Sequence, residues 1–183
     1  MVKLNYNIIV PGDVVLTTSL SSIGCGIRIK EAGVKNIFNT RIATHVGIIV
    51  PIRDNPRILA IAEMLYDGLH IRNLSNYLNQ GYFGDRIVDI KRFQPFFNNV
   101  YITNQIFSWW EKGKKFDYFG ILEYIFPFIR DKDNRFYCSE MIEWLALNIT
   151  KRSLIENKKS LSDNIMPYEI QKSKLLISVD WRN

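Results

Sequence analysis

A cysteine and a histidine lie in the local settings that thiol catalysis uses. Cys138 stands where the apolar helical periodicity of segment 138–149 begins, and His45 stands in the apolar, strand-like segment 44–50. A thiolate is the nucleophile in such chemistry, and the free N–H groups and dipole at a helix start stabilise it. A histidine fixed on a strand can serve as the activating base. These two settings predict a cysteine hydrolase or acyltransferase.

A carboxylate supplies a third candidate group. Glu63 interrupts the apolar segment 58–64, which is typical of a second strand. The polar turn 52–57 joins the two predicted strands, so they are expected to be antiparallel neighbours, with directly opposed Cβ atoms about 4.5–5.5 Å apart. Because a buried charge is costly unless it is paired, Glu63 is predicted to orient His45. A charge on an edge strand is the alternative.

The residues next to Cys138 form a weaker set of candidates. Tyr137, Ser139 and Glu140 are predicted to flank the oxyanion site or the rim of the substrate site. The backbone N–H of Cys138, at the helix start, is predicted to help bind the oxyanion. Glu140 and Glu143 are i, i+3 neighbours on this helix and could mimic a hydrolytic pair, but a structural role or a place at the rim of the substrate site is favoured.

Other polar and aromatic residues are predicted to be structural. Cys25 lies in an apolar helical stretch and is expected in the core, whereas His70 is expected on the surface or in a turn. Trp109 and Trp110 lie beside several lysines, an arrangement that can stack nucleic-acid bases. Their helical spacing favours a core position instead. The chain has no Walker A loop and no Rossmann fingerprint.

The hydrophobic pattern predicts the elements that position these groups. Strands are expected at 14–17, 44–50, 58–64, 68–72, 86–92 and 175–179, and helices at 19–32, 74–79, 98–112, 119–129 and 138–149. This order is typical of an α+β fold with a mostly antiparallel meander in its middle and helices packed on the sheet.

Composition favours one ordinary globular domain over residues 1–183. The 183 residues are 47% hydrophobic and 23% charged. Two cysteines do not make a disulfide scaffold, and their number excludes a zinc ribbon. No signal peptide is visible at the start, and the longest apolar stretch, about 12 residues, is too short to span a bilayer. The expectation is therefore a cytoplasmic protein with reduced thiols.

Charge limits the partners that the sequence predicts. The net charge is +6, and the basic residues are scattered along the chain. This charge favours mild attraction to an anionic membrane surface but does not indicate a nucleic-acid-binding site. A small peptide or lipid is the expected substrate, with no metal or organic cofactor. The oligomeric state stays open.

Short motifs in a fixed order carry a resemblance to a known family. They are Pro11-Gly12-Asp13-Val14-Val15, Thr44-His45-Val46-Gly47-Ile48, Ala62-Glu63, Tyr137-Cys138-Ser139-Glu140, and Pro167-Tyr168-Glu169-Ile170 followed by Ser173. Together they resemble the permuted branch of the NlpC/P60 superfamily, in particular the YiiX/YebB-like group, to which a poxvirus family also belongs. The resemblance runs from about residue 11 to residue 177.

The resemblance implies a papain-like fold with circularly permuted order, in which the histidine strand comes first and the cysteine helix last. Its catalytic set is a cysteine, a histidine and a polar residue on the next strand, which correspond by position to Cys138, His45 and Glu63. The superfamily divides between amide bonds of cell-wall peptides and acyl bonds of lipids. The aromatic-rich segment 116–128 could line an acyl-binding groove or fill the core.

Two other classes remain open. A catalytically silent binding protein, or a virion-associated protein of phage or another virus, could retain the fold; the intact Cys-His-Glu set argues against this. A metal site built from His45, Glu63 and Cys138 is the third interpretation, because three mixed ligands can hold zinc.

Overall fold

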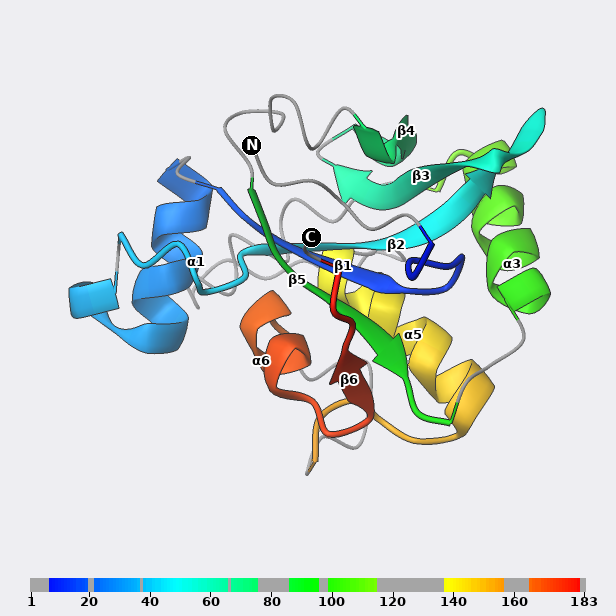
Figure 1. Ribbon diagram of the computed structural model, residues 1–183. Helices are drawn as coiled ribbons and strands as arrows, with labels where there is room; N and C mark the ends of the chain where they lie inside the picture. Colours follow the sequence, from blue (N-terminus) through cyan, green and yellow to red (C-terminus); the bar gives the residue numbers. More distant parts are fainter. Residues whose placement is uncertain are drawn as a thin grey trace.

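The computed structural model describes most of the chain. It covers residues 7–19, 22–36, 38–65, 67–75, 86–95, 99–114, 137–156 and 165–181. The strands are β1 (Val14–Thr18), β2 (His45–Ile52), β3 (Asn55–Leu65), β4 (Gly68–Asn73), β5 (Arg86–Phe93) and β6 (Leu176–Ser178). The helices are α1 (Ser22–Ala32), α3 (Asn99–Glu111), α5 (Cys138–Thr150) and α6 (Pro167–Lys172), with a short 3₁₀ helix η1 (Val34–Asn36) (Figure 1).

The strands form one antiparallel sheet. Its order is β4-β3-β2-β1-β5-β6, and every neighbouring pair is antiparallel. The consecutive strands β2, β3 and β4 form the predicted meander, while β1 lies between β2 and β5. The α+β class with an antiparallel sheet is confirmed.

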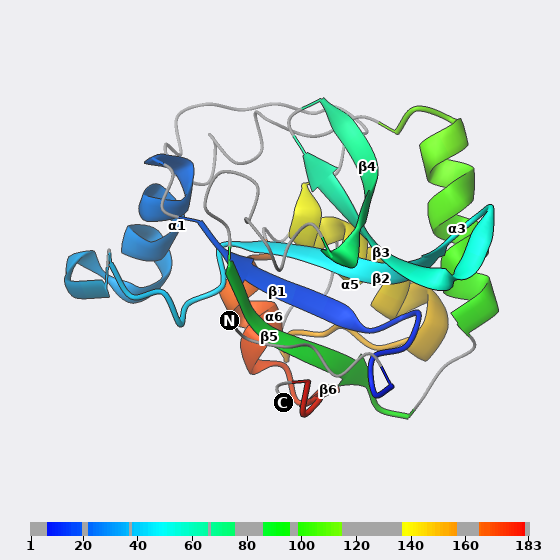
Figure 2. The same ribbon diagram turned by 45° about the horizontal axis from the view of Figure 1, so that its top comes forward.

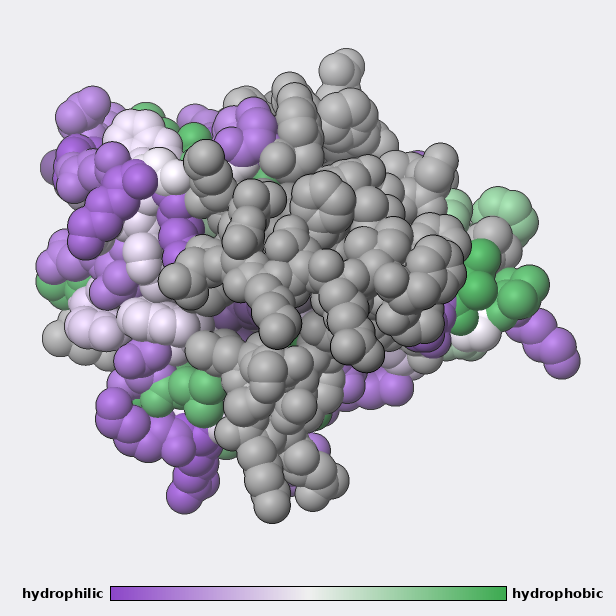
Figure 3. Space-filling model, turned by 180° about the vertical axis from the view of Figure 1, so that it is seen from behind, coloured by the Kyte–Doolittle hydropathy of each residue, from purple (hydrophilic) through white to green (hydrophobic). Residues whose placement is uncertain are grey.

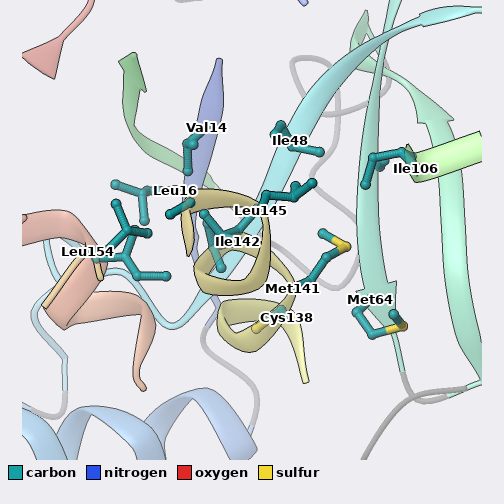
Figure 4. Close-up of a cluster of buried hydrophobic side chains, with 14 of the residues drawn as sticks. Val14, Leu16, Ile48, Met64, Ile106, Cys138, Met141, Ile142, Leu145 and Leu154 are labelled. Atoms are coloured by element: carbon teal, nitrogen blue, oxygen red, sulfur yellow. The ribbon is translucent and has the colours of Figure 1, made fainter. Parts of the chain in front are cut away.

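Alternation along the strands gives the sheet two apolar faces. On one face Val14, Leu16 and Ile48 pack in the same cluster as the α5 residues Ile142 and Leu145. Figure 4 shows these side chains converging on α5. Neighbouring strand residues point the other way into a smaller cluster, whose fully buried members include Val15, Ile49, Ile61 and Ile90. Helix α5 is therefore fixed against the middle of the sheet.

The turn between β2 and β3 is shorter than the sequence predicts. Pro51, which follows the predicted strand 44–50, stays in the ladder opposite Leu59, and the register shifts between Pro51 and Ile52. Proline is tolerated in a sheet at such an irregularity because it has no N–H to donate. The two strands thus form a longer hairpin that extends well beyond His45.

Helix α3 follows its predicted stripe except at one residue. Ile102, Ile106 and Trp109 are buried, but Trp110 is exposed. Trp109 makes an edge-to-face contact with Trp144 of α5, with ring centroids 4.8 Å apart. The predicted core role is therefore correct for Trp109 and wrong for Trp110.

Two predicted helices fall largely or wholly outside the described residues. Of segment 74–79 only residues 74 and 75 are described, and they are helical, while segment 119–129 is not described. Within the described part of the chain, every helix is too short or too polar to cross a bilayer.

Candidate active site

His45 and Glu63 meet on one face of the β2–β3 hairpin. Glu63 pairs directly with Gly47, not with His45. Because side chains alternate along a strand, His45, two residues before Gly47, lies on the same face as Gly47. His45 is therefore the diagonal neighbour of Glu63 on the adjacent strand. His45 Nε2 and Glu63 Oε2 are 2.9 Å apart. The predicted contact is present, but the directly opposed register was wrong.

Gly47 makes room for this diagonal contact. A Cβ atom at Gly47 would lie 2.6 Å from Ile61 Cγ2, 2.9 Å from the Ala62 carbonyl oxygen and 3.3 Å from Glu63 Cβ. The carbonyl belongs to the neighbouring strand and cannot move without disturbing the ladder. Glycine therefore allows the two strands to remain close where Glu63 reaches across to His45.

Arg72 forms an ion pair with the other oxygen of the Glu63 carboxylate. Arg72 of β4 places Nη2 2.8 Å from Glu63 Oε1, and the Glu63 side chain is only 1% exposed. Arg72 pairs with Ile61 in the sheet, so it lies on the same face as Glu63. Two positively polarised partners offset the cost of burying this carboxylate. Arg72 was not among the residues predicted from the sequence, because only the register of β3 and β4 places it on this face.

Cys138 is the first residue of α5. Tyr137 is the N-cap residue, and its backbone N–H donates to Glu140 Oε2 at 3.2 Å. Glu140 therefore caps the helix start. The first N–H groups of a helix have no acceptor within the helix, so the N–H of Cys138 is available to a ligand. Cys138 itself is buried, with a free thiol.

The titration of His45 reflects its contact with both partners. Burial alone lowers the pKa of His45, but the charge and hydrogen bond of Cys138, followed by those of Glu63, outweigh it. The pKa of His45 is therefore raised well above its ordinary value of 6.5. Neighbouring groups that stabilise the charged imidazole shift its pKa in this direction. The structure thus brings the three predicted residues together.

Tyr137 and Ser139 both bind the backbone of Ile165. The Tyr137 hydroxyl accepts from Ile165 N–H at 2.7 Å, and Ser139 Oγ donates to the Ile165 carbonyl oxygen at 2.5 Å. Both side chains are buried, and burial raises the pKa of Tyr137. Their geometry is that of anchors for the segment that leads into α6. Contact of these residues, or of Glu140, with a substrate remains a prediction.

Helix α6 fastens the start of the histidine strand. Gln171 Oε1 accepts from Ala43 N–H at 3.0 Å, and Gln171 Nε2 donates to the Arg41 carbonyl oxygen at 2.9 Å. Ser173, the serine of the C-terminal motif, donates to the Leu154 carbonyl oxygen at 2.6 Å. The C-terminal motif thus fixes the backbone just before His45 and just after α5.

Thr17 presents a buried hydroxyl beside His45. It is paired with His45 across β1 and β2. Among the described residues its Oγ1 has no hydrogen-bond partner, and the residue is buried. Nothing in the sequence pattern singled it out, because its environment depends on the sheet register.

The side chains of the remaining candidates make other contacts. Cys25, predicted in the core, is only partly buried, and Arg28 Nη2 lies 3.2 Å from its sulfur. That prediction was wrong, because the α1 face that carries Cys25 is not fully covered. His70 is exposed and pairs with Asp67 at 2.7 Å, which agrees with a surface role. Glu143 is buried and accepts from Leu154 N–H at 2.9 Å, a structural contact.

The donor set does not fit a metal ion. Among the described residues no group of three or more His, Cys, Asp or Glu side chains could hold one. Glu63, the natural carboxylate ligand, has one oxygen at His45 and the other at Arg72. A guanidinium this close to the carboxylate disfavours a second cation by repulsion.

Comparison with known proteins identifies the fold. No protein-family model matches the sequence, and no curated protein matches it. The structure is similar to the crystal structure of the metalloprotein yiiX from Escherichia coli O157:H7, DUF1105. The TM-score is 0.65 at 16% sequence identity, with 93% of this chain and 96% of that chain covered. The chain therefore has a yiiX-like fold.

Proposed function

We propose that this protein is a cysteine-dependent hydrolase or acyltransferase of the permuted, papain-like NlpC/P60 type, which acts on an amide or acyl ester bond. The observation that carries the proposal is the contact of His45 with Glu63 at 2.9 Å, together with the raised pKa of His45, to which Cys138 contributes. A thiol at a helix start, a base and an orienting carboxylate are the parts that thiol catalysis requires.

The resting state in this proposal is an ion pair. Cys138, as the thiolate, attacks the substrate carbonyl, and the oxyanion of the tetrahedral intermediate binds the Cys138 backbone N–H. Protonated His45 then gives its proton to the leaving group, which leaves a thioester on Cys138. In the second half, His45 takes a proton from water, or from the acceptor hydroxyl or amine of a transferase, as that group attacks the thioester.

Glu63 acts on His45 directly, and Arg72 acts on it through Glu63. Glu63 holds the imidazole in one orientation and stabilises its charged form. Arg72 fixes the second oxygen of Glu63, so the carboxylate keeps its charge although it is buried. Arg72 is a positioning residue in this scheme, because it acts through Glu63.

Among substrates we favour an acyl bond in a lipid, or a peptide amide inside a host cell, over direct cleavage of a cell wall by a self-secreted enzyme. The support is the net charge of +6, which attracts anionic membrane surfaces. The aromatic segment 116–128, a predicted acyl groove, lies outside the described residues.

Two incubations test the proposal. The purified protein is treated with muropeptides in one, and with short-chain acyl esters and phospholipids in the other, each beside Cys138→Ala and the matched control Cys25→Ala. Turnover of esters or lipids that is lost in Cys138→Ala and kept in Cys25→Ala is expected. Cysteine-dependent release of wall peptides alone would reverse the substrate preference. No turnover in either assay would favour the alternative of a binding or virion-associated protein without catalytic activity.

A metal-dependent function has one point in its favour: the similar structure is that of a metalloprotein. Against it stands the donor set, in which Glu63 already contacts His45 and Arg72. Metal analysis of the purified protein decides between the two: a stoichiometric metal lost in Glu63→Gln would replace thiol catalysis with a metal centre.

A further inference from the structure

Helix α1 and the 3₁₀ helix η1 project from one end of the sheet. They lie at the same extremity of the molecule in both ribbon views, away from α3 (Figures 1 and 2). The chain returns from η1 directly into β2, so this projection is at the end of the sheet where His45 begins the strand.

The end of the projection exposes apolar side chains. Phe38 is 78% exposed and Val34 is 71% exposed, and Ile29 of α1 is also exposed. We call these three residues the η1 tip. Figure 3 shows hydrophobic side chains gathered at the edge of the molecule that carries α1 and η1. Single exposed apolar residues are ordinary, but a local cluster that includes an aromatic ring indicates a contact surface.

Basic residues lie close to the η1 tip in the sequence. Lys30, Lys35 and Arg41 are all exposed. The only acidic residue between Arg28 and Arg41 in the sequence is Glu31. Apolar side chains at the end of a projection, with cations beside them, match the chemistry of an anionic lipid surface, where acyl chains lie beneath charged headgroups.

Hydrogen bonds link the described residues of the projection to one another and to α6. Asn36 Nδ2 donates to the Ala32 carbonyl oxygen at 2.6 Å, and Asn39 Nδ2 donates to Asn36 Oδ1 at 3.2 Å. Gln171 then holds Arg41 and Ala43 to α6. A surface that is preorganised loses little conformational entropy when it binds.

We propose that the η1 tip docks this protein on anionic membranes, with Phe38 and Val34 entering the boundary between headgroups and acyl chains and Lys35 and Arg41 contacting the headgroups. A projecting tip fits a lipid surface better than a protein groove, because it can enter the layer without a matching cavity. The docking does not depend on the chemistry of Cys138, so it stands apart from the proposed catalysis.

Vesicle sedimentation tests the docking. Vesicles of phosphatidylcholine alone are compared with vesicles of phosphatidylcholine and phosphatidylserine. We expect binding to the anionic vesicles that weakens with added salt. Phe38→Ser should weaken it at least about tenfold, from the lost burial of one aromatic side chain. Lys35→Glu should weaken it by about fivefold or more.

Val100→Ser is the matched control, because Val100 is 64% exposed on α3, away from the tip. This variant and Cys138→Ala should bind vesicles like the parent protein, and thermal melts should show that Phe38→Ser is folded. Phe38→Trp should retain binding. Absence of vesicle binding, or equal losses in Val100→Ser and Phe38→Ser, would overturn the proposal. A dimer of the parent protein that Phe38→Ser dissociates, without vesicle binding, would assign the tip to a second copy of this chain.

Discussion

Glu63 has a separate partner for each carboxylate oxygen, and this arrangement determines the electrostatics of the candidate site. Ion pairs that are shielded from water interact more strongly than exposed ones. The sequence predicted the pair with His45, because an acidic residue stood alone in an apolar strand beside the histidine strand. It did not predict Arg72, because only the register of β3 and β4 shows that Arg72 lies within reach of Glu63.

At this scale the first prediction concerns the pKa of His45. Since Cys138 and Glu63 both raise this pKa and burial lowers it, Cys138→Ala and Glu63→Gln should each lower it. The double variant should bring it below the ordinary value of 6.5. Proton NMR titration measures this directly, because the chain has two histidines and His70→Gln assigns their signals. An unchanged pKa in Cys138→Ala would contradict the thiolate–imidazolium pair.

The same shift has a consequence for stability. A histidine whose pKa is raised by folding stabilises the native state fully below its unfolded pKa of about 6.5. This contribution is lost as pH rises through the raised folded pKa. The difference in the free energy of unfolding between the parent and His45→Gln should therefore be largest in mild acid and shrink in alkali. Urea unfolding across pH measures it.

A graded series of variants tests the roles of the three polar residues. Cys138→Ala should abolish turnover, by about 10⁶-fold if the enzyme behaves like other nucleophile knockouts. Glu63→Gln should cost less, up to about 10⁴-fold, because the nucleophile remains. Arg72→Met should cost less again, and Arg72→Lys should restore part of the loss. Steady-state kinetics, with whichever substrate the two incubations identify, gives the order.

The control for this series is His70→Gln. His70 lies opposite Glu63 in the sheet, but its side chain pairs with Asp67 at the surface. Its removal should leave turnover and the pH profile unchanged. In Arg72→Met the fall should appear in kcat, with a shifted pH profile and little change in KM. Full activity of Glu63→Gln would mean that another residue orients His45.

At the scale of elements, the hairpin of β2 and β3 positions His45 and Glu63, and α5 carries the proposed nucleophile, Cys138. Periodicity predicted the strands and α5 nearly to their observed bounds, since these elements bury continuous apolar stripes. It placed the β2–β3 turn incorrectly, because Pro51 is normally a strand terminator and the bulge that admits it depends on pairing. The hydrogen bonds of Tyr137 and Ser139 to Ile165 also could not be predicted from the sequence, because residue 165 is distant along the chain.

Gly47 gives a prediction for this hairpin. Gly47→Ala should lower the free energy of unfolding by about 1–3 kcal/mol, because the added methyl group overlaps the Ala62 carbonyl. The loss of turnover should exceed what the unfolded fraction explains, since the strands separate where Glu63 reaches His45. Gly33→Asn is the control: a Cβ there meets nothing within 4 Å, and asparagine tolerates its positive φ. Equal stability of Gly47→Ala and the parent would contradict this prediction and show that the hairpin accommodates the added methyl group.

At the scale of the whole molecule, two thiols at distant positions in the chain have different surroundings. Cys138 lies at a helix start with His45, while Cys25 lies within α1 beside Arg28. Iodoacetamide at mildly acidic pH should alkylate Cys138 far faster than Cys25, because its thiol lies at a helix start beside His45, a setting that favours reactive thiols. Mass spectrometry of the labelled peptides measures both rates.

The variants Cys25→Ala and Cys138→Ala provide the matched controls for labelling. His45→Gln should slow the reaction of Cys138 and leave that of Cys25 unchanged. Cys138 is buried and Cys25 is partly exposed, so accessibility alone predicts the opposite order. Preferential labelling of Cys25 would therefore refute the assignment of the nucleophile.

The dependence of the histidine strand on α6 also bears on how the protein matures. A ribosome makes His45 and Glu63 long before Cys138, and Gln171, which ties down the backbone before His45, comes later still. Contacts between residues so far apart in the chain form late in folding. In the nascent polypeptide, the proposed base and carboxylate therefore precede both the proposed nucleophile and the helix that fixes the backbone before His45.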